Sequence, residues 1–146
     1  MPPLKNALSR RQGFAPTSLS TGDAAYVCSI GKSNVEAKAT GFTFSVPLSG
    51  NSPEEDTMSR VGKTEGAWTI KLDLVGAKET VPHPTSRLPG VIHRLHGPTR
   101  SWQRYVPTYG GLSYQEVWPG IDLSVRSAMG FKYEFAVQPG SDPGDI

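Results

Sequence analysis

The stretch IDLSVRSAMGFKYEFAV, residues 121–137, decides the fold because it joins two alternating segments through a tight turn. In its second half, Phe131, Tyr133, Phe135 and Val137 form one apolar stripe between polar or small residues. A period of two is typical of antiparallel strands with one buried face. The stretch therefore predicts a β-hairpin whose apolar stripe joins the hydrophobic core.

The same alternation extends toward the N-terminus. Residues 25–30 begin a strand, and residues 35–46 alternate on both sides of Gly41. In residues 67–77, one face carries Trp68, Ile70, Leu72 and Leu74. Sixteen glycines and 13 prolines, about a fifth of the 146 residues, indicate many turns and short strands. We predict an all-β fold, an antiparallel β-sandwich formed by residues 24–146 as a single domain.

Other segments lack this pattern. Residues 1–23 show no period and predict a flexible lead-in, and residues 47–66 predict a long polar loop. Four prolines in residues 78–100 predict mostly a connection, since proline is confined to sheet edges and turns. Residues 101–109 predict an irregular edge strand interrupted at Pro107.

Composition excludes several classes of protein. A formal net charge of +2, with basic residues scattered along the chain, argues against nucleic-acid binding. The sequence contains no run of 18 apolar residues, so no membrane span is predicted. The N-terminal residues also lack the apolar segment of a signal peptide. The single cysteine, Cys28, excludes an internal disulfide and is expected to be a small buried hydrophobe.

Catalytic chemistry has one candidate pair. Asp122 is either a reactive carboxylate or a side chain that bonds nearby backbone N–H groups in a turn, and we favour the turn. If the hairpin register pairs it with Glu134, the two carboxylates are an alternative glycoside hydrolase site. His93, His96 and Cys28 are too few and too dispersed for a metal site. We expect no enzyme activity, no metal and no cofactor.

Aromatic residues offer a binding hypothesis. Trp118, Tyr109 and Tyr114 either belong to the core or form a platform on which sugar rings stack. The second possibility describes a carbohydrate-binding module.

Residues 105–146 resemble the N-terminal β-rich domain of bacterial SBBP-repeat proteins, a domain of unknown function. The resemblance rests on VPTY at residues 106–109, WPGIDL at residues 118–123 and the spaced residues that follow. Its motif positions read as structural; they include Pro119, Gly120, Asp122, Gly130, Tyr133, Pro139, Gly140 and Asp142.

Members of that family look like large exported or cell-surface proteins. The resemblance therefore implies an extracellular module with a structural or adhesive role, whose partners are other domains of the same protein, glycans or surface proteins. The family continues into a further strand where this sequence stops at Ile146, which implies a domain truncated at its C-terminus. Residues 131–137 would then form an exposed sheet edge, with a tendency to aggregate.

Overall fold

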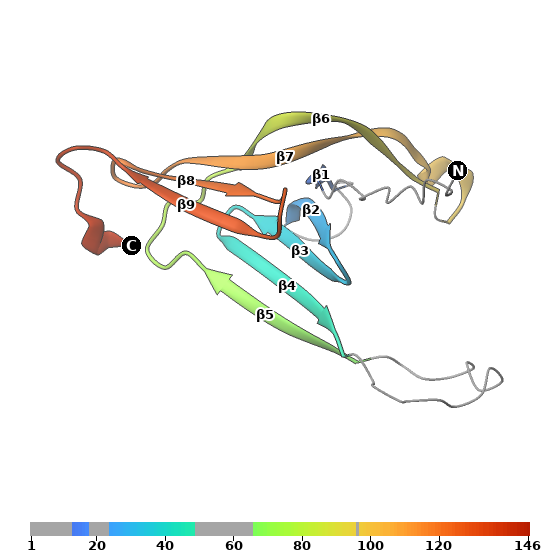
Figure 1. Ribbon diagram of the computed structural model, residues 1–146, viewed down its shortest axis with the longest axis horizontal. Helices are drawn as coiled ribbons and strands as arrows, with labels where there is room; N and C mark the ends of the chain where they lie inside the picture. Colours follow the sequence, from blue (N-terminus) through green and yellow to red (C-terminus); the bar gives the residue numbers. More distant parts are fainter. Residues whose placement is uncertain (1–12, 18–23, 49–65, 96) are drawn as a thin grey trace, which may run out of the picture.

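The computed structural model of the chain describes residues 13–17, 24–48, 66–95 and 97–146 (Figure 1). Two antiparallel sheets face each other, which confirms the predicted all-β sandwich. The first sheet has the order β1-β2-β3-β4-β5, and the second has the order β6-β7-β8-β9.

The first sheet is built from successive hairpins. β2 and β3 turn at Gly31, whose φ of 62° favours glycine, and β3 and β4 turn at residues 39–40. Its strands are β1 (Ala15–Pro16), β2 (Ala24–Ile30), β3 (Ser33–Lys38), β4 (Gly41–Pro47) and β5 (Ala67–Asp73).

The second sheet begins with a long two-stranded ribbon, which arches above the first sheet in Figure 1. It consists of β6 (His83–Arg94) and β7 (Gln103–Trp118), joined through the 3₁₀ turn η1 (Thr99–Ser101). The hairpin β8 (Ile121–Arg126) and β9 (Lys132–Val137) follows, with a last 3₁₀ turn η2 (Pro143–Asp145). None of the helical turns in the described ranges is long and apolar enough to cross a membrane.

The core lies between the two sheets. β8 contributes Ile121, Leu123 and Val125, and the facing sheet contributes Val35 and Phe42, among other residues. These positions alternate along their strands as the sequence predicts, because one face of each sheet is buried.

Part of the expected lead-in belongs to the fold. Phe14 is fully buried, and its backbone exchanges hydrogen bonds of 2.7 and 2.8 Å with Tyr109 of β7. β1 therefore closes one corner between the sheets, and residues 13–17 extend the predicted domain toward the N-terminus. Residues 1–12 and 18–23 of the lead-in, and residues 49–65 of the predicted polar loop, lie outside the described residues.

Two predictions about the proline-rich region are wrong. Residues 83–94 form β6 rather than a connection, and β7 runs through Pro107 without interruption. β6 is an edge strand, and proline, which lacks a backbone N–H group, is tolerated at the edge of a sheet. Pro84 and Pro89 therefore do not interrupt the pairing of an interior strand. The register between β6 and β7 also shifts twice, and such bulges accommodate residues that cannot pair regularly.

Candidate functional site

β9 is the last strand of its sheet. It pairs with β8 through its whole length, and among the described residues no strand pairs with its other side. Its core-facing residues are identified by register, because Tyr133 lies opposite Val125 and Phe135 opposite Leu123, both buried. Phe135 packs against the core, but Tyr133 remains 52% exposed.

The expectation that this apolar stripe joins the core therefore holds only in part. Phe131 and Phe135 are partly buried, whereas Tyr133 and Val137 are exposed. The physical reason is the position of β9 at the edge, where one flank of each side chain lacks a neighbouring strand.

β5 faces the space beside β9. The ring of Phe131, just before β9, lies 5.1 Å from the Phe42 ring and 5.0 Å from the Phe44 ring, so β4 and the beginning of β9 face each other. β5 is the next strand after β4, and within the described ranges the four-stranded sheet supplies no strand opposite it.

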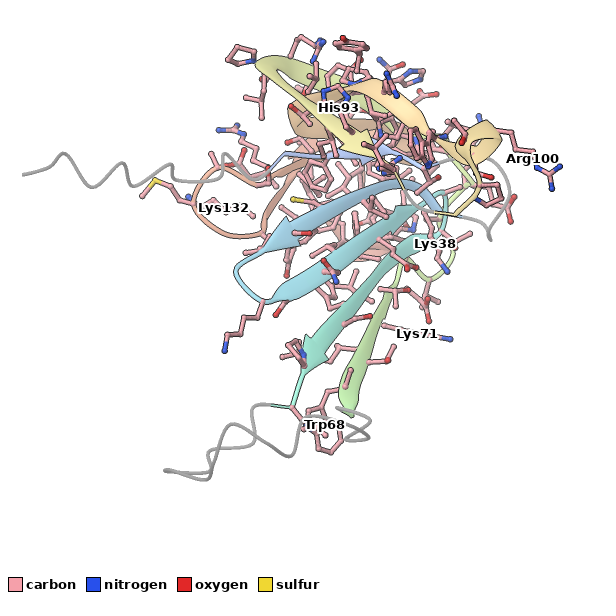
Figure 2. The ribbon with its side chains drawn as sticks, turned by 90° about the vertical axis from the view of Figure 1, so that its right-hand side faces the viewer. Lys38, Trp68, Lys71, His93, Arg100 and Lys132 are labelled. Atoms are coloured by element: carbon pink, nitrogen blue, oxygen red, sulfur yellow. The ribbon has the colours of Figure 1, made fainter. Side chains whose placement is uncertain are left out.

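The core-facing side of β5 is uncovered in the first part of the strand, whereas Leu72 further along packs against the core. Ile70 lies opposite Phe44 and Trp68 opposite Val46, which places both on the inner face, yet they are 56% and 66% exposed. Figure 2 shows Trp68 at the far end of the β4–β5 hairpin. We use the name open edge for the outer side of β9 together with four exposed apolar residues, Tyr133 and Val137 of β9 and Trp68 and Ile70 of β5.

The open edge has the chemistry of a strand-binding site. An edge strand presents unpaired backbone N–H and C=O groups, which another extended chain satisfies by adding a strand. The apolar residues of β5 and β9 then select a strand with apolar side chains at alternate positions.

The residues predicted to form a sugar-stacking platform lie elsewhere. Tyr114 is fully buried against Phe42, and Trp118 is 6% exposed, with its indole N–H donating to the Val75 carbonyl at 3.2 Å. Tyr109 is half-buried beside Tyr26. Because a sugar ring needs an exposed aromatic face, these three residues do not form a platform.

The hydroxyl group of Tyr114 is buried and has no hydrogen-bond partner among the residues that the structure describes. Burial also raises the pKa of Tyr114 above its ordinary value of about 10. We expect Tyr114→Phe to leave the free energy of unfolding unchanged or to raise it by about 1 kcal/mol, because an unsatisfied polar group is removed. Since the folded state holds this proton more tightly, the wild type loses stability above pH about 10, and the variant lacks that contribution. Urea unfolding at pH 7 and pH 11 tests both statements, and a large loss at pH 7 contradicts the first.

Asp122 holds a backbone irregularity. Between Tyr114 and Trp118, β7 bulges relative to β8, and Glu116 in the bulge has a φ of 49°. The Asp122 carboxylate accepts a hydrogen bond of 2.7 Å from the Glu116 N–H. Asp122 thus bonds a nearby backbone N–H group as we expected of it, at a bulge beside the turn.

The register does not pair the two carboxylates. Glu134 lies opposite Ser124, whereas Asp122 lies opposite Ala136. Glu134 forms an exposed ion pair of 3.0 Å with Arg126. Each carboxylate therefore has a structural partner of its own.

Substitutions at Asp122 should act on stability. Asp122→Ala is expected to cost about 1.5–3 kcal/mol, the value of a hydrogen bond to a charged group, because the Glu116 N–H loses its acceptor. Asp122→Asn keeps an acceptor oxygen and should cost less, and Glu134→Gln should cost at most about 1 kcal/mol. Thermal or urea unfolding of the three variants ranks them, and equal effects at Asp122 and Glu134 contradict the assigned role.

The motif glycines and Asp142 shape turns. Gly120, Gly130 and Gly140 have φ values of 67°, 105° and 91°, which few other residues adopt. The Pro119–Gly120 turn also lies under the segment after β9, since the Gln138 N–H donates to the Gly120 carbonyl at 2.9 Å. Asp142 accepts a hydrogen bond of 2.8 Å from the Gly144 N–H, whereas Pro139 and Tyr133 are exposed.

Nucleophile and metal chemistry find little support. Cys28 is buried, as predicted, and burial raises the pKa of its thiol. His93 accepts a hydrogen bond from the Tyr105 N–H at 3.3 Å, and His96 lies outside the described residues. Within the part of the chain that the structure describes, no three His, Cys, Asp or Glu side chains are grouped to hold a metal ion.

Sequence reasoning missed the residues of the open edge that lie on β5. Trp68 and Ile70 carry the same alternation as buried residues, so the pattern marks their face without showing whether a strand covers it.

Residues 12–146 match the family described as a domain of unknown function (DUF7948). Comparison with curated proteins gave no match, and comparison with solved structures gave none either. Because the family match covers nearly the whole chain, including both sheets and the open edge, the protein belongs to the DUF7948 family.

Proposed function

We propose that the chain is a non-catalytic β-sandwich module of a larger bacterial exported or cell-surface protein, with a structural or adhesive role. The observation that carries the proposal is the open edge: among the described residues, β9 lacks a second partner strand, and Trp68 and Ile70 in the first part of β5 are not covered by a facing strand. The resemblance of residues 105–146 to SBBP-repeat proteins supports the same assignment. The partner is a strand from another domain or segment of that protein.

The energetics favour a strand that belongs to the same polypeptide. Full burial of an apolar side chain contributes about 1.5–3 kcal/mol, and Tyr133, Ile70 and Val137 are now about half exposed, so their burial adds a few kcal/mol. Ordering each residue of an incoming strand costs about 1–2 kcal/mol. A free peptide also loses translational freedom, whereas a tethered strand does not pay that cost again.

A tethered strand tests the proposal. In Figure 1 the C-terminus lies on the same side of the sandwich as the end of β5. A Gly/Ser linker of about eight residues, with a root-mean-square span of about 16 Å, can carry a strand of alternating Val and Thr from Ile146 toward β9. We expect the free energy of unfolding to rise by about 2 kcal/mol.

The matched control has the same composition with the alternation shifted by one residue, which turns its apolar side chains away from β5. It should give no gain. Equal stability of the two proteins, or no gain from either, would show that the edge does not accept a strand.

A further inference from the structure

Most of the β6–β7 ribbon carries charge of one sign, with Glu116 near the end of β7 as the exception. Residues 80–115 contain four arginines and three histidines but no aspartate or glutamate, although the whole chain has 15 basic and 13 acidic residues. Four of the eight arginines of the chain therefore lie on this ribbon, whereas the other four are scattered as expected.

Two of these arginines are available to a ligand. In the described part of the chain the ion pairs are Lys38–Glu36 and Arg126–Glu134, so no described carboxylate forms an ion pair with the four arginines of the ribbon. Arg94 is held within the fold, where it donates to the Pro16 carbonyl at 2.6 Å. Arg104 is exposed, with its guanidinium 5.5 Å above the Trp102 ring, and Arg100 extends outward from η1 (Figure 2).

The backbone turns an aromatic ring toward solvent beside Arg104. Tyr105 has a φ of 58°, and the residue is 73% exposed. Its ring packs edge-on against His93 at 4.9 Å, next to a register shift between Ile92 and Arg94. The bulge leaves both Arg104 and Tyr105 exposed, although neighbouring residues of a regular strand face opposite sides. Such strained positions cluster at ligand sites.

A groove of about 460 Å³ runs along this surface. Its lining includes Pro16, Trp102, Arg104, Tyr105 and Pro107. Arg104, an exposed aromatic face and a groove thus lie together at one end of the ribbon, and Arg100 precedes Trp102 of the lining by two residues.

We propose that this groove binds an acidic polysaccharide. Arg104 and Arg100 pair with its carboxylate or sulfate groups, and the face of Tyr105 stacks on a sugar ring. An acidic polysaccharide presents its charges at intervals with sugar faces between them, which suits two cations beside one aromatic ring.

A nucleic acid fits this surface less well. Its phosphates are closely spaced, about one charge per 1.7 Å of duplex, and proteins that bind it make many phosphate contacts. The net charge of +2 and the two outward arginines give a weaker electrostatic footprint than that.

The test measures affinity for four probes by calorimetry: polygalacturonate, dextran sulfate, neutral dextran and a single-stranded DNA oligonucleotide. We expect binding to at least one acidic glycan, with the carboxylate and sulfate arms identifying the preferred anion. Tyr105→Ala should weaken it about tenfold, by analogy with other aromatic stacking contacts. Arg104→Gln should weaken it about threefold, as expected for an exposed charge pair.

Two matched substitutions on the other end of the sheet serve as controls. Tyr133→Ala and Arg126→Gln remove an exposed tyrosine and an exposed arginine from β9 and β8, and neither should change the affinity. All variants should keep the melting temperature within a few degrees, because the replaced side chains are exposed. Failure to bind either acidic glycan, equal binding to neutral dextran, tighter binding to DNA, or equal losses in the controls would each overturn the proposal.

Discussion

Gly41→Ala is expected to destabilise the fold by about 3 kcal/mol or more, a large part of the stability of a domain of this size. Gly41 has a φ of 152°, at the start of β4 where it pairs with Asp73 of β5. An alanine Cβ would overlap the backbone carbonyl oxygen of Leu72. Because that atom belongs to the partner strand, no side-chain rotation relieves the overlap, and the β4–β5 hairpin must shift.

Gly31→Ala is the matched control for this effect. Gly31 also has a positive φ, 62°, but beyond its immediate chain neighbours no atom of the described residues lies within 4 Å of the position that an alanine Cβ would occupy. It should cost only about 1–2 kcal/mol, the conformational strain of the left-handed region. Urea unfolding gives the loss of unfolding free energy for each variant, and the difference between the two losses is the cost of the overlap. Equal losses contradict the close approach of β4 and β5.

Trp118→Ala is expected to cost about 3–5 kcal/mol. The indole ring is buried beside Phe135 at 5.7 Å, and its N–H bonds the Val75 carbonyl, so the substitution leaves both a cavity and an unpaired acceptor. Trp118 thereby ties the loop after β5 to the end of β7. A protein that unfolds at a much lower urea concentration is the expected result.

Trp68→Ala provides the comparison, since the same side chain is removed from an exposed position of β5. It should change the free energy of unfolding by less than about 0.5 kcal/mol. If Trp118→Ala instead kept full stability and abolished glycan binding, Trp118 would be a ligand-binding residue rather than a core residue.

Local alternation predicted much of the fold. β3, β4, β8 and β9 each follow from a period of two, because the direction of successive side chains along a strand is a local property. The role of Asp122 was also predictable in kind, since aspartate commonly bonds a backbone N–H group a few residues away.

The arrangement of strands was not predictable in the same way. Whether Ile70 and Tyr133 are covered depends on how many strands each sheet contains, and that number is a property of the whole fold. The prolines of β6 led to the wrong prediction of a connection for a related reason. Proline is compatible with a strand only at the edge of a sheet, and the position of β6 at an edge is a property of the whole fold. The basic surface of the ribbon was visible in the sequence as the acid-free residues 80–115, but the exposure of Tyr105 depends on a bulge.

The central claim is that β9 has an open outer side, and amide hydrogen exchange tests it most directly. In an antiparallel edge strand, the N–H groups of alternate residues point toward the neighbour or away from it. At low protein concentration, half of the amides in Lys132–Val137 should therefore exchange rapidly, while those directed toward β8 stay protected like β8 itself. Uniform protection of all six residues, at the level of β8, would contradict an open edge.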